Sequence, residues 1–310
     1  MKKQWKIFFK IAISLGLILF LLSRIDIQTL GQNLARANLW WLIATILLFV
    51  ISILLRTWRW QILVNSRWAD IKFGQLIRWY YIGAFFNTLL PTGFGGDVAR
   101  SIYLARETDD AGGAVGTVVL DRFLGILVLL GLGAIAAPFC QANITIWIQI
   151  FIVGMFIGAL ATFWALRQKV WIRWLHEQAL RLIPSAVNRR ITNMESLHSL
   201  YLALQDYDTP TLLRAITVSF IFNLLWILIN ITAGMAVGVQ GTLLDFLVFV
   251  PLASLALLIP SIGGIGVREL SYVGLFTQIG VAAETAFAMS IVVYLATIAT
   301  GLIGGVLMLF

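Results

Sequence analysis

Two glycine-rich segments bring acidic and basic side chains into a chain that is otherwise strongly apolar. The first reads LLPTGFGGDVAR (residues 89–100) and the second reads LIPSIGGIGVRE (residues 258–269). In each segment a proline ends an apolar run because it lacks a backbone donor, and the glycines allow backbone angles that other residues avoid. A helix that begins after such a break presents unpaired N–H groups and a partial positive charge. The chemistry that these residues favour is therefore the binding of an anion.

Three couples of an acid and an arginine are predicted in or near these segments. They are Asp97 with Arg100, Asp121 with Arg122 within the apolar motif VVLDRFLG (residues 118–125), and Glu269 with Arg268. Ionisable residues inside membrane segments are costly and usually functional. Either the couples neutralise one another and lock the structure, or at least one arginine contacts a substrate. No catalytic residue is predicted. The predicted substrate-binding residues are Asn87, Thr92, Gly93, Gly95, Gly96, Asp97, Arg100, Asp121, Arg122, Ser261, Gly263, Gly264, Arg268 and Glu269.

The composition is that of a membrane protein. Hydrophobic residues make up 60% of the 310 positions and charged residues 12%, whereas soluble domains are about half apolar and about a quarter charged. Runs with little or no charge recur at a length that crosses a bilayer. We therefore predict an all-α polytopic membrane protein with one integral membrane domain over residues 1–310. The six expected full spans are residues 7–23, 39–55, 114–137, 144–166, 215–237 and 285–310.

Two further apolar regions are interrupted too early to cross a bilayer. One run ends at Pro91 and the other at Pro260. Runs of this length suit half-helices, so we predict re-entrant helical hairpins over residues 79–106 and 246–281. The likeness of the two breaks indicates an inverted internal repeat, which is the plan of many transporters whose broken helices meet near the bilayer midplane. The predicted repeats cover residues 39–137 and 211–310.

The basic residues, which give a formal net charge of +8, are unevenly placed. The connections near residues 138–143 and 238–242 hold no Lys or Arg, whereas residues 167–208 hold five Arg and one Lys. Because basic residues mark cytoplasmic loops, we predict a multi-pass protein of the cell inner (plasma) membrane with a cytoplasmic N-terminus. Residues 167–208 are predicted to be a basic amphipathic segment on that face. The basic cluster after the second span consists of Arg56, Arg59, Arg67, Lys72 and Arg78.

Orientation in the membrane accounts for this placement of charge, so nucleic acid is not expected as a partner. Anionic membrane lipids are expected partners, since basic residues beside a bilayer attract their headgroups. Cys140 is the single cysteine, which excludes an intramolecular disulfide and offers no metal cluster. No cofactor and no metal are predicted.

The motifs NTLLPTGFGGDVAR, VVLDRFLG and PSIGGIGVRE resemble those of the lysylphosphatidylglycerol synthase transmembrane (flippase-like) family. The resemblance runs from about residue 39 to the C-terminus. It implies a membrane domain of the kind that, in multiple-peptide-resistance proteins, flips aminoacylated phosphatidylglycerol between leaflets. In the bifunctional relatives the synthase activity belongs to a soluble domain after the membrane region. This chain ends at Phe310, within its last expected span, so we do not expect it to be an enzyme.

Three function classes follow from these observations. The first is a flippase-like transporter that moves an anionic, phosphate-headgroup lipid or lipid-linked precursor between leaflets. The alternative is a membrane-embedded transferase acting on a lipid or polyprenyl phosphate, with Asp97, Asp121 or Glu269 as its base. No P-loop is present to drive transport with ATP. The third class is a structural subunit, because Gly301 and Gly305 form a GxxxG pattern that suits close helix packing within one chain or in a homodimer.

Overall fold

The computed structural model describes residues 15–68, 71–89, 94–140, 146–167, 207–259, 261 and 263–309. Within these ranges every regular element is a helix and none is a strand. Five helices are long and apolar enough to cross a membrane, and the bent pair Leu15–Leu22 and Ile27–Ala35 is a sixth candidate. The predicted all-α polytopic membrane fold is therefore confirmed, and the protein is a multi-pass membrane protein.

The long helices correspond to five of the six predicted spans, and residues 7–14 of the first predicted span (residues 7–23) lie outside the described residues. The candidate spans are α3 (Leu39–Asn65), α6 (Ala111–Ala136), α7 (Ile146–Arg167), α11 (Thr209–Val237) and α14 (Ala283–Leu307). The other elements are α2 (Ile27–Ala35), α4 (Phe73–Leu89), α5 (Gly95–Thr108), η1 (Ala137–Phe139), α12 (Leu243–Ala256), α13 (Val267–Phe276) and η2 (Thr277–Ile279).

Polar caps begin several of these helices at the residue where the apolar run starts. Asn38 accepts a hydrogen bond from the Trp40 amide at the start of α3, and Asp110 accepts one from the Gly113 amide at the start of α6. Such caps satisfy donors that have no partner inside the helix. They fix the residues at which α3 and α6 begin.

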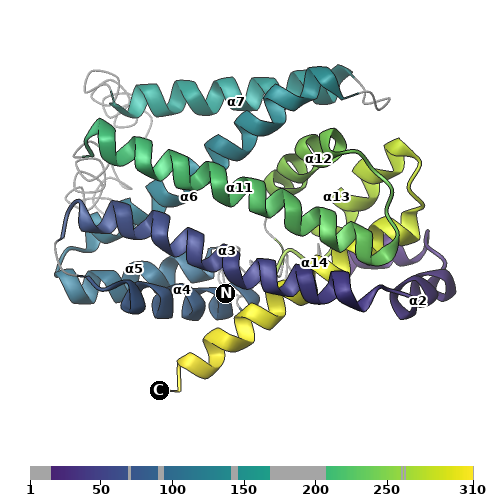
Figure 1. Ribbon diagram of the computed structural model, residues 1–310, viewed down its shortest axis with the longest axis horizontal. Coiled ribbons are helices and arrows are strands. Elements are labelled where there is room, and N and C mark those ends of the chain that lie inside the picture. The colour runs from purple at the N-terminus through teal and green to yellow at the C-terminus, as the bar shows by residue number, and fades with distance from the viewer. Residues whose placement is uncertain are drawn as a thin grey trace, which may run out of the picture.

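Two pairs of shorter helices fill opposite halves of the molecule. The first hairpin consists of α4 and α5, and the second hairpin consists of α12 and α13. In Figure 1 they lie to the left and to the right. The 17 residues of α4 and the 10 of α13 span about 25 and about 15 Å, less than the hydrocarbon thickness of about 30 Å. These lengths agree with re-entrant hairpins, whose insertion into a bilayer stays a prediction.

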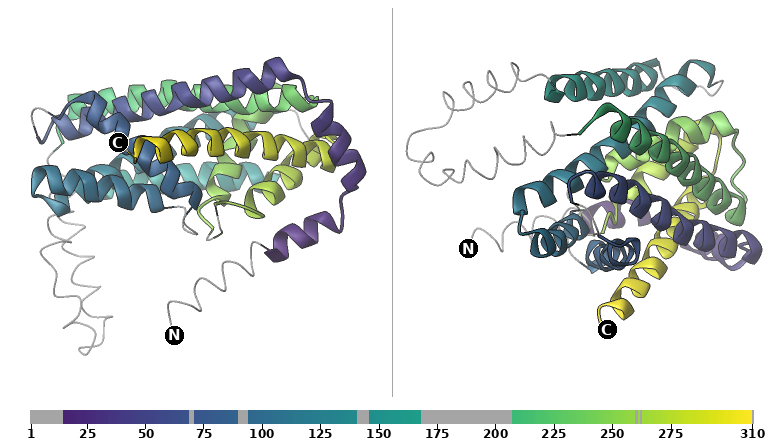
Figure 2. Two further views of the ribbon diagram at one scale, coloured as in Figure 1. Left: turned by 90° about the horizontal axis from the view of Figure 1, so that it is seen from below. Right: turned by 60° about the vertical axis from the view of Figure 1, so that its left-hand side comes forward.

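The tips of the two hairpins meet inside the molecule. A Cβ placed on Gly263, in the break of the second hairpin, would lie 3.8 Å from the carbonyl oxygen of Thr88, near the end of α4. Helices α3 and α11 run side by side, and α14 packs against both (Figure 2). Helix α14 contacts both tips, through Gly301 beside Thr88 and through Tyr294 beside Gly263.

Close backbone contact joins the first hairpin to α14. A Cβ on Gly304 would overlap the carbonyl group of Tyr81, and one on Gly301 would lie 2.7 Å from the Thr88 hydroxyl. Gly305 likewise faces the ring of Phe85. The GxxxG pattern thus packs within the chain at these contacts, and a homodimer stays a prediction.

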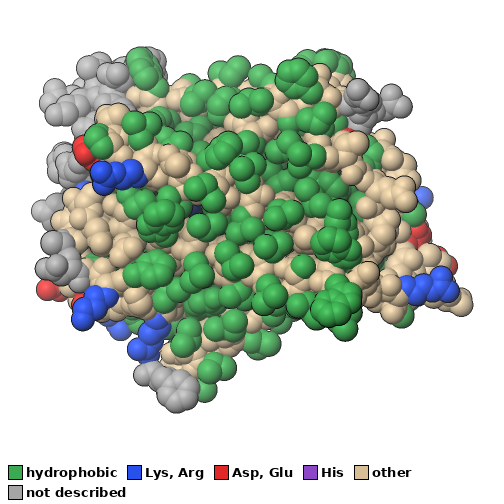
Figure 3. Space-filling model, viewed as in Figure 1, with side chains coloured by type: hydrophobic (Ala, Val, Ile, Leu, Met, Phe, Trp, Pro, Cys, Tyr) green, Lys and Arg blue, Asp and Glu red, His purple; other side chains and the backbone are tan. Residues whose placement is uncertain are grey.

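The outer surface is apolar along the length of the long helices. Figure 3 shows a broad band of hydrophobic side chains on one face, with charged side chains gathered toward the two ends. Helix α7 is the extreme case, since only 6% of its most apolar 18-residue window is buried. A pocket of about 420 Å³ separates Trp147 and Phe151 of α7 from Leu252 and Leu270 of the second hairpin. These surfaces are suited to contact with lipid.

One boundary predicted from the sequence is wrong. The second span was expected to end at residue 55, but α3 continues to Asn65. Arg56 and Arg59 therefore lie inside a helix, not in a cytoplasmic loop. The reason is that each guanidinium has aromatic or carboxylate neighbours in the interior. A count of basic residues along the sequence cannot reveal such neighbours. Most of the predicted amphipathic segment, residues 168–206, lies outside the described residues.

The contact between α4 and α14 predicts the effect of adding one methyl group. In Gly304→Ala the new Cβ meets the Tyr81 carbonyl, and overpacking of this kind costs about 1–3 kcal/mol. We expect a lower melting temperature in detergent. Gly154→Ala on α7 is the matched control, because nothing lies within 4 Å of its Cβ and alanine favours a helix. Equal melting of the two variants would show that the contact is not tight.

The order of the helices predicts which exposed positions share a membrane face. Single cysteines at Lys72 and Asp109, introduced with Cys140→Ala, should react with an impermeant thiol reagent from one side. A cysteine at Gly241 should react from the other side, because α11 separates it from them (Figure 1). Labelling of Lys72 and Asp109 from opposite sides would rule out a re-entrant first hairpin.

Candidate functional site

A chain of five charged side chains crosses the interior between α3, α5 and α6. The Nε atom of Arg59 lies 2.6 Å from Oδ1 of Asp121, and Nη1 of Arg100 lies 3.3 Å from Oδ2 of the same carboxylate. The Nη2 atom of Arg100 also donates to Oδ1 of Asp97 at 2.7 Å. The other oxygen of Asp97 accepts from Arg122. Each carboxylate is therefore shared by two guanidinium groups.

This chain of charged side chains runs from a sealed end, enclosed in the interior, to an open end that is partly exposed. Asp121 and Arg59 are 1% and 3% exposed, whereas the side chains of Asp97 and Arg122 are 18% and 35% exposed. At the sealed end Arg59 also donates to the hydroxyl of Ser219 on α11, at 3.1 Å. Removing one partner from a buried ion pair leaves an uncompensated charge. Only the open end of this chain of charges is exposed at the surface.

Aromatic rings cover the arginines of α5 and α6. The guanidinium carbon of Arg100 lies 4.1 Å from the ring centre of Tyr80 and 4.9 Å from that of Trp60. That of Arg122 lies 4.5 Å from the ring of Phe94, at the tip of the first hairpin. Rings at these distances attract a cation through their electron-rich faces. They allow the arginines to remain charged away from water.

Positive charge exceeds negative charge in this region. Three arginines face two aspartates in the chain. Arg56 adds a fourth cation one turn before Arg59, with its guanidinium 5.1–5.9 Å from the rings of Phe49, Tyr80 and Phe222. No carboxylate in the described part of the chain lies within 4 Å of Arg56. The site is therefore electropositive and suits an anion.

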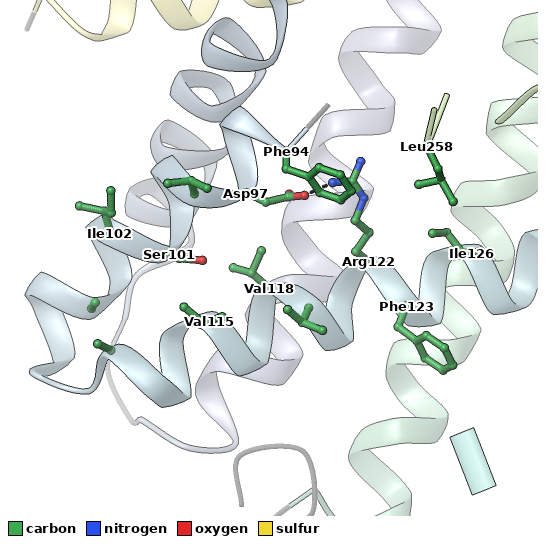
Figure 4. Close-up of a pocket in the computed structure, with 14 residues that line it drawn as sticks. Phe94, Asp97, Ser101, Ile102, Val115, Val118, Arg122, Phe123, Ile126 and Leu258 are labelled. Carbon is green, nitrogen blue, oxygen red and sulfur yellow. Dashed lines mark hydrogen bonds and ion pairs between the residues drawn. The ribbon is translucent and has the colours of Figure 1, made fainter. Parts of the chain in front are cut away.

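A groove with a volume of about 540 Å³ runs between α5 and α6, past the open end of the charged chain. Figure 4 shows Asp97 and Arg122 meeting beside Phe94, with Ile102 and Val115 on one side of the pair. Apolar side chains also line the other side. The outward-facing lining residues are exposed on the helix surface, so the groove is accessible from the side. They are Val98, Ile102, Val115 and Val119.

The predicted couple of Arg268 with Glu269 is wrong. The carboxylate of Glu269 accepts a hydrogen bond from the Gly266 amide at 2.5 Å and so caps its own helix, α13. Arg268 turns the other way, with its guanidinium 4.7 Å from the ring centre of Tyr294 and Nη2 3.3 Å from the Gly263 carbonyl oxygen. Adjacent residues on a helix point in different directions. The two side chains therefore have separate partners.

The couple of Asp121 with Arg122 is also wrong, for the same reason. Asp121 faces Arg59 and Arg100, whereas Arg122 faces Asp97. Asp97 with Arg100 is present as expected, because residues three apart lie on one face of a helix. The structure thus joins two predicted couples into one chain through exchanged partners.

The remaining predicted residues shape the two breaks. Asn87 accepts a hydrogen bond from the Gly96 amide at 2.7 Å, which ties the end of α4 to the start of α5. A Cβ on Gly96 would overlap the Gly83 carbonyl, so this close crossing requires glycine. Buried Ser261 donates to the Ile259 carbonyl oxygen at 3.4 Å. Gly95 is the first residue of α5. Gly263 and Gly264 have φ of +57° and +80°, a conformation that favours glycine. Thr92 and Gly93 lie outside the described residues.

Sequence reasoning missed Arg56, Arg59 and Ser219. The signal that could have found the arginines is their spacing, since Arg56 and Arg59 continue an apolar helix without a break in the pattern. For a metal site the structure offers no support in the described ranges, because no three His, Cys, Asp or Glu side chains gather closely enough to hold an ion.

Comparison with known proteins adds a family. The family model described as the lysylphosphatidylglycerol synthase TM region matches residues 7–305. The UPF0104 membrane protein PH1989 of Pyrococcus horikoshii is 24% identical over 309 residues, which covers 91% of this chain and 89% of that protein. No solved structure matches the chain.

The shared carboxylate of Asp121 predicts a large loss of stability on its removal. Asp121→Asn leaves Arg59 without a buried counter-charge and leaves Arg100 with Asp97 alone, which costs about 3–5 kcal/mol. Unfolding in mixed micelles by sodium dodecyl sulfate should show this loss. Asp109→Asn is the matched control, because Asp109 is exposed and its positive φ of 51° is one that asparagine tolerates. Equal stability of both variants would contradict the structural role.

Proposed function

The chain belongs to the lysylphosphatidylglycerol synthase transmembrane-region family, and from this premise we propose that it moves an anionic, phosphate-headgroup lipid between membrane leaflets. The observation that carries the proposal is the electropositive chain whose open end lies in a side-opening apolar groove. An amphiphile needs both features at once, because its headgroup seeks charge and hydrogen bonds while its tails stay in lipid. Clefts that combine apolar walls with a few polar groups are the usual form of ligand sites.

Arg122 is the residue that first meets the headgroup in this proposal. It is the most exposed member of the charged chain, and it lines the groove. A phosphate group can approach this guanidinium from the groove, and the planar fork of arginine matches oxyanions. Asp97 keeps its second partner, Arg100. Binding therefore requires no charge to be left alone.

The arrangement of the hairpins supports a route across the membrane. We propose that residues 39–137 and 211–310 are inverted repeats, because each contributes one hairpin and the two enter from opposite halves of the molecule (Figure 1). The face that carries Lys72 and Asp109 would be cytoplasmic by the distribution of basic residues. In transporters of this plan, one repeat moves against the other around a central site.

The transferase alternative is weaker because the candidate bases are already engaged. Asp97 and Asp121 each accept hydrogen bonds from two arginines, and such bonds stabilise the charged form of a carboxylate. Glu269 caps α13. A general base must be able to accept a proton from its substrate. These three carboxylates already accept hydrogen bonds from arginines or from a helix N-terminus.

A transport assay with lipid analysis tests the proposal. Protein in vesicles should move headgroup-labelled phosphatidylglycerol between leaflets without changing its mass. Arg122→Gln should slow this movement at least tenfold, because the headgroup loses its charged contact, while Arg106→Gln, an exposed arginine on the same hairpin, should not. A product of altered mass would favour the transferase. Equal rates in the two variants would show that the groove is not the transport site.

A further inference from the structure

We propose that the tip of the second hairpin is a second anion-binding site, separate from the groove, with Arg268 as the residue that holds the anion. The proposal rests on the proposed function for its ligand, a singly charged phosphodiester headgroup. The site itself is argued from the interior contacts of Arg268. Its binding can be measured without transport.

Arg268 is a buried cation with unused hydrogen-bonding capacity. The residue is 6% exposed, and its Nη1 atom is buried with no acceptor. No carboxylate among the described residues lies within 4 Å of it, since the nearest acid in sequence, Glu269, accepts from the Gly266 amide instead. A buried charge is costly unless it is paired. The free donor therefore marks a place where an anion belongs.

The backbone around Arg268 adds to the same preference. The guanidinium lies at the N-terminal end of α13, a helix of 10 residues whose first turn carries a partial positive charge. Gly264 keeps space for it, because a Cβ there would lie 3.1 Å from Nη2 of Arg268 and 2.9 Å from Leu257. The ring of Tyr294 supports its other face. The arginine is thus held in place before any ligand arrives.

This site and the groove are distinct but adjacent. Leu258 lines the groove, whereas its neighbour Leu257 packs toward Gly264 and Arg268. Neither Arg268 nor Tyr294 lines the groove. The second site lies where the two hairpin tips meet, beside the Thr88 carbonyl. A headgroup released by Arg122 would therefore pass the pair of leucines to reach Arg268, which makes the two arginines successive positions on one route.

The absence of a counter-charge predicts an unusual effect of mutation. Arg268→Gln removes an uncompensated buried cation, so the variant without ligand should melt no lower than the parent in detergent. Arg100→Gln is the matched control, because it removes a paired buried cation and leaves Asp97 and Asp121 each short of a partner. That variant should melt well below the parent. If Arg268→Gln also melts well below the parent, Arg268 is a structural residue and the proposal fails.

Binding is tested with the soluble short-chain lipid dihexanoylphosphatidylglycerol and, in a second arm, with inorganic phosphate. Calorimetric titration of Arg268→Gln should show one fewer site than the parent. Arg122→Gln should also lose one site, and the double variant should lose both. Saturation by the lipid alone identifies a lipid headgroup as the ligand, and saturation by phosphate as well identifies a general oxyanion site. An unchanged number of sites in Arg268→Gln would overturn the proposal.

The two proposals can fail separately. If the parent moves no lipid in vesicles but Arg268→Gln has lost a binding site, the second site stands and the transport proposal fails. If the parent moves lipid and Arg268→Gln binds as the parent does, the transport proposal stands and the second site is wrong.

Discussion

The cost of burying charge away from water determines much of this structure. Asp121 is almost fully enclosed, and its two oxygens face arginines from two other helices, α3 and α5. Because neither arginine can lose its proton, the shared carboxylate is the counter-charge that makes their burial tolerable. A helix that begins in the interior, as α5 does, needs such a shared counter-charge to hold it at a fixed position. The location of the groove follows from that position.

Glycine supplies the second constraint. The crossing of Gly83 with Gly96 and the approach of Gly304 to Tyr81 bring backbones together without side chains between them. Apolar attraction between helices is weak in lipid, so close packing of small residues provides much of their association. These contacts place the first hairpin against α14, and the ion pairs then attach it to α6. Packing and charge therefore act on the same element from two sides.

Much of the fold could be predicted from the sequence, because length, hydropathy and helix-breaking residues act locally. Both breaks lie where Pro91 and Pro260 indicated them, and Asp97 pairs with Arg100 as their spacing required. The other ion pairs could not be predicted, since they join residues on different helices. Arg59 and Asp121 are 62 positions apart. Sequence adjacency suggested couples for Asp121 and Glu269 that the direction of helical side chains does not permit.

The packing of helix α7 has a consequence for how the protein contacts lipid or detergent. It packs mainly against α6, through contacts such as the stacked rings of Phe123 and Phe163, and leaves a pocket of about 420 Å³ toward the second hairpin. In a bilayer, acyl chains are the material that fills such a space. The hydrocarbon around the protein is therefore part of the wall between α7 and the second hairpin. Chain length and saturation of the surrounding lipids, or of the detergent that replaces them, become structural variables of this protein.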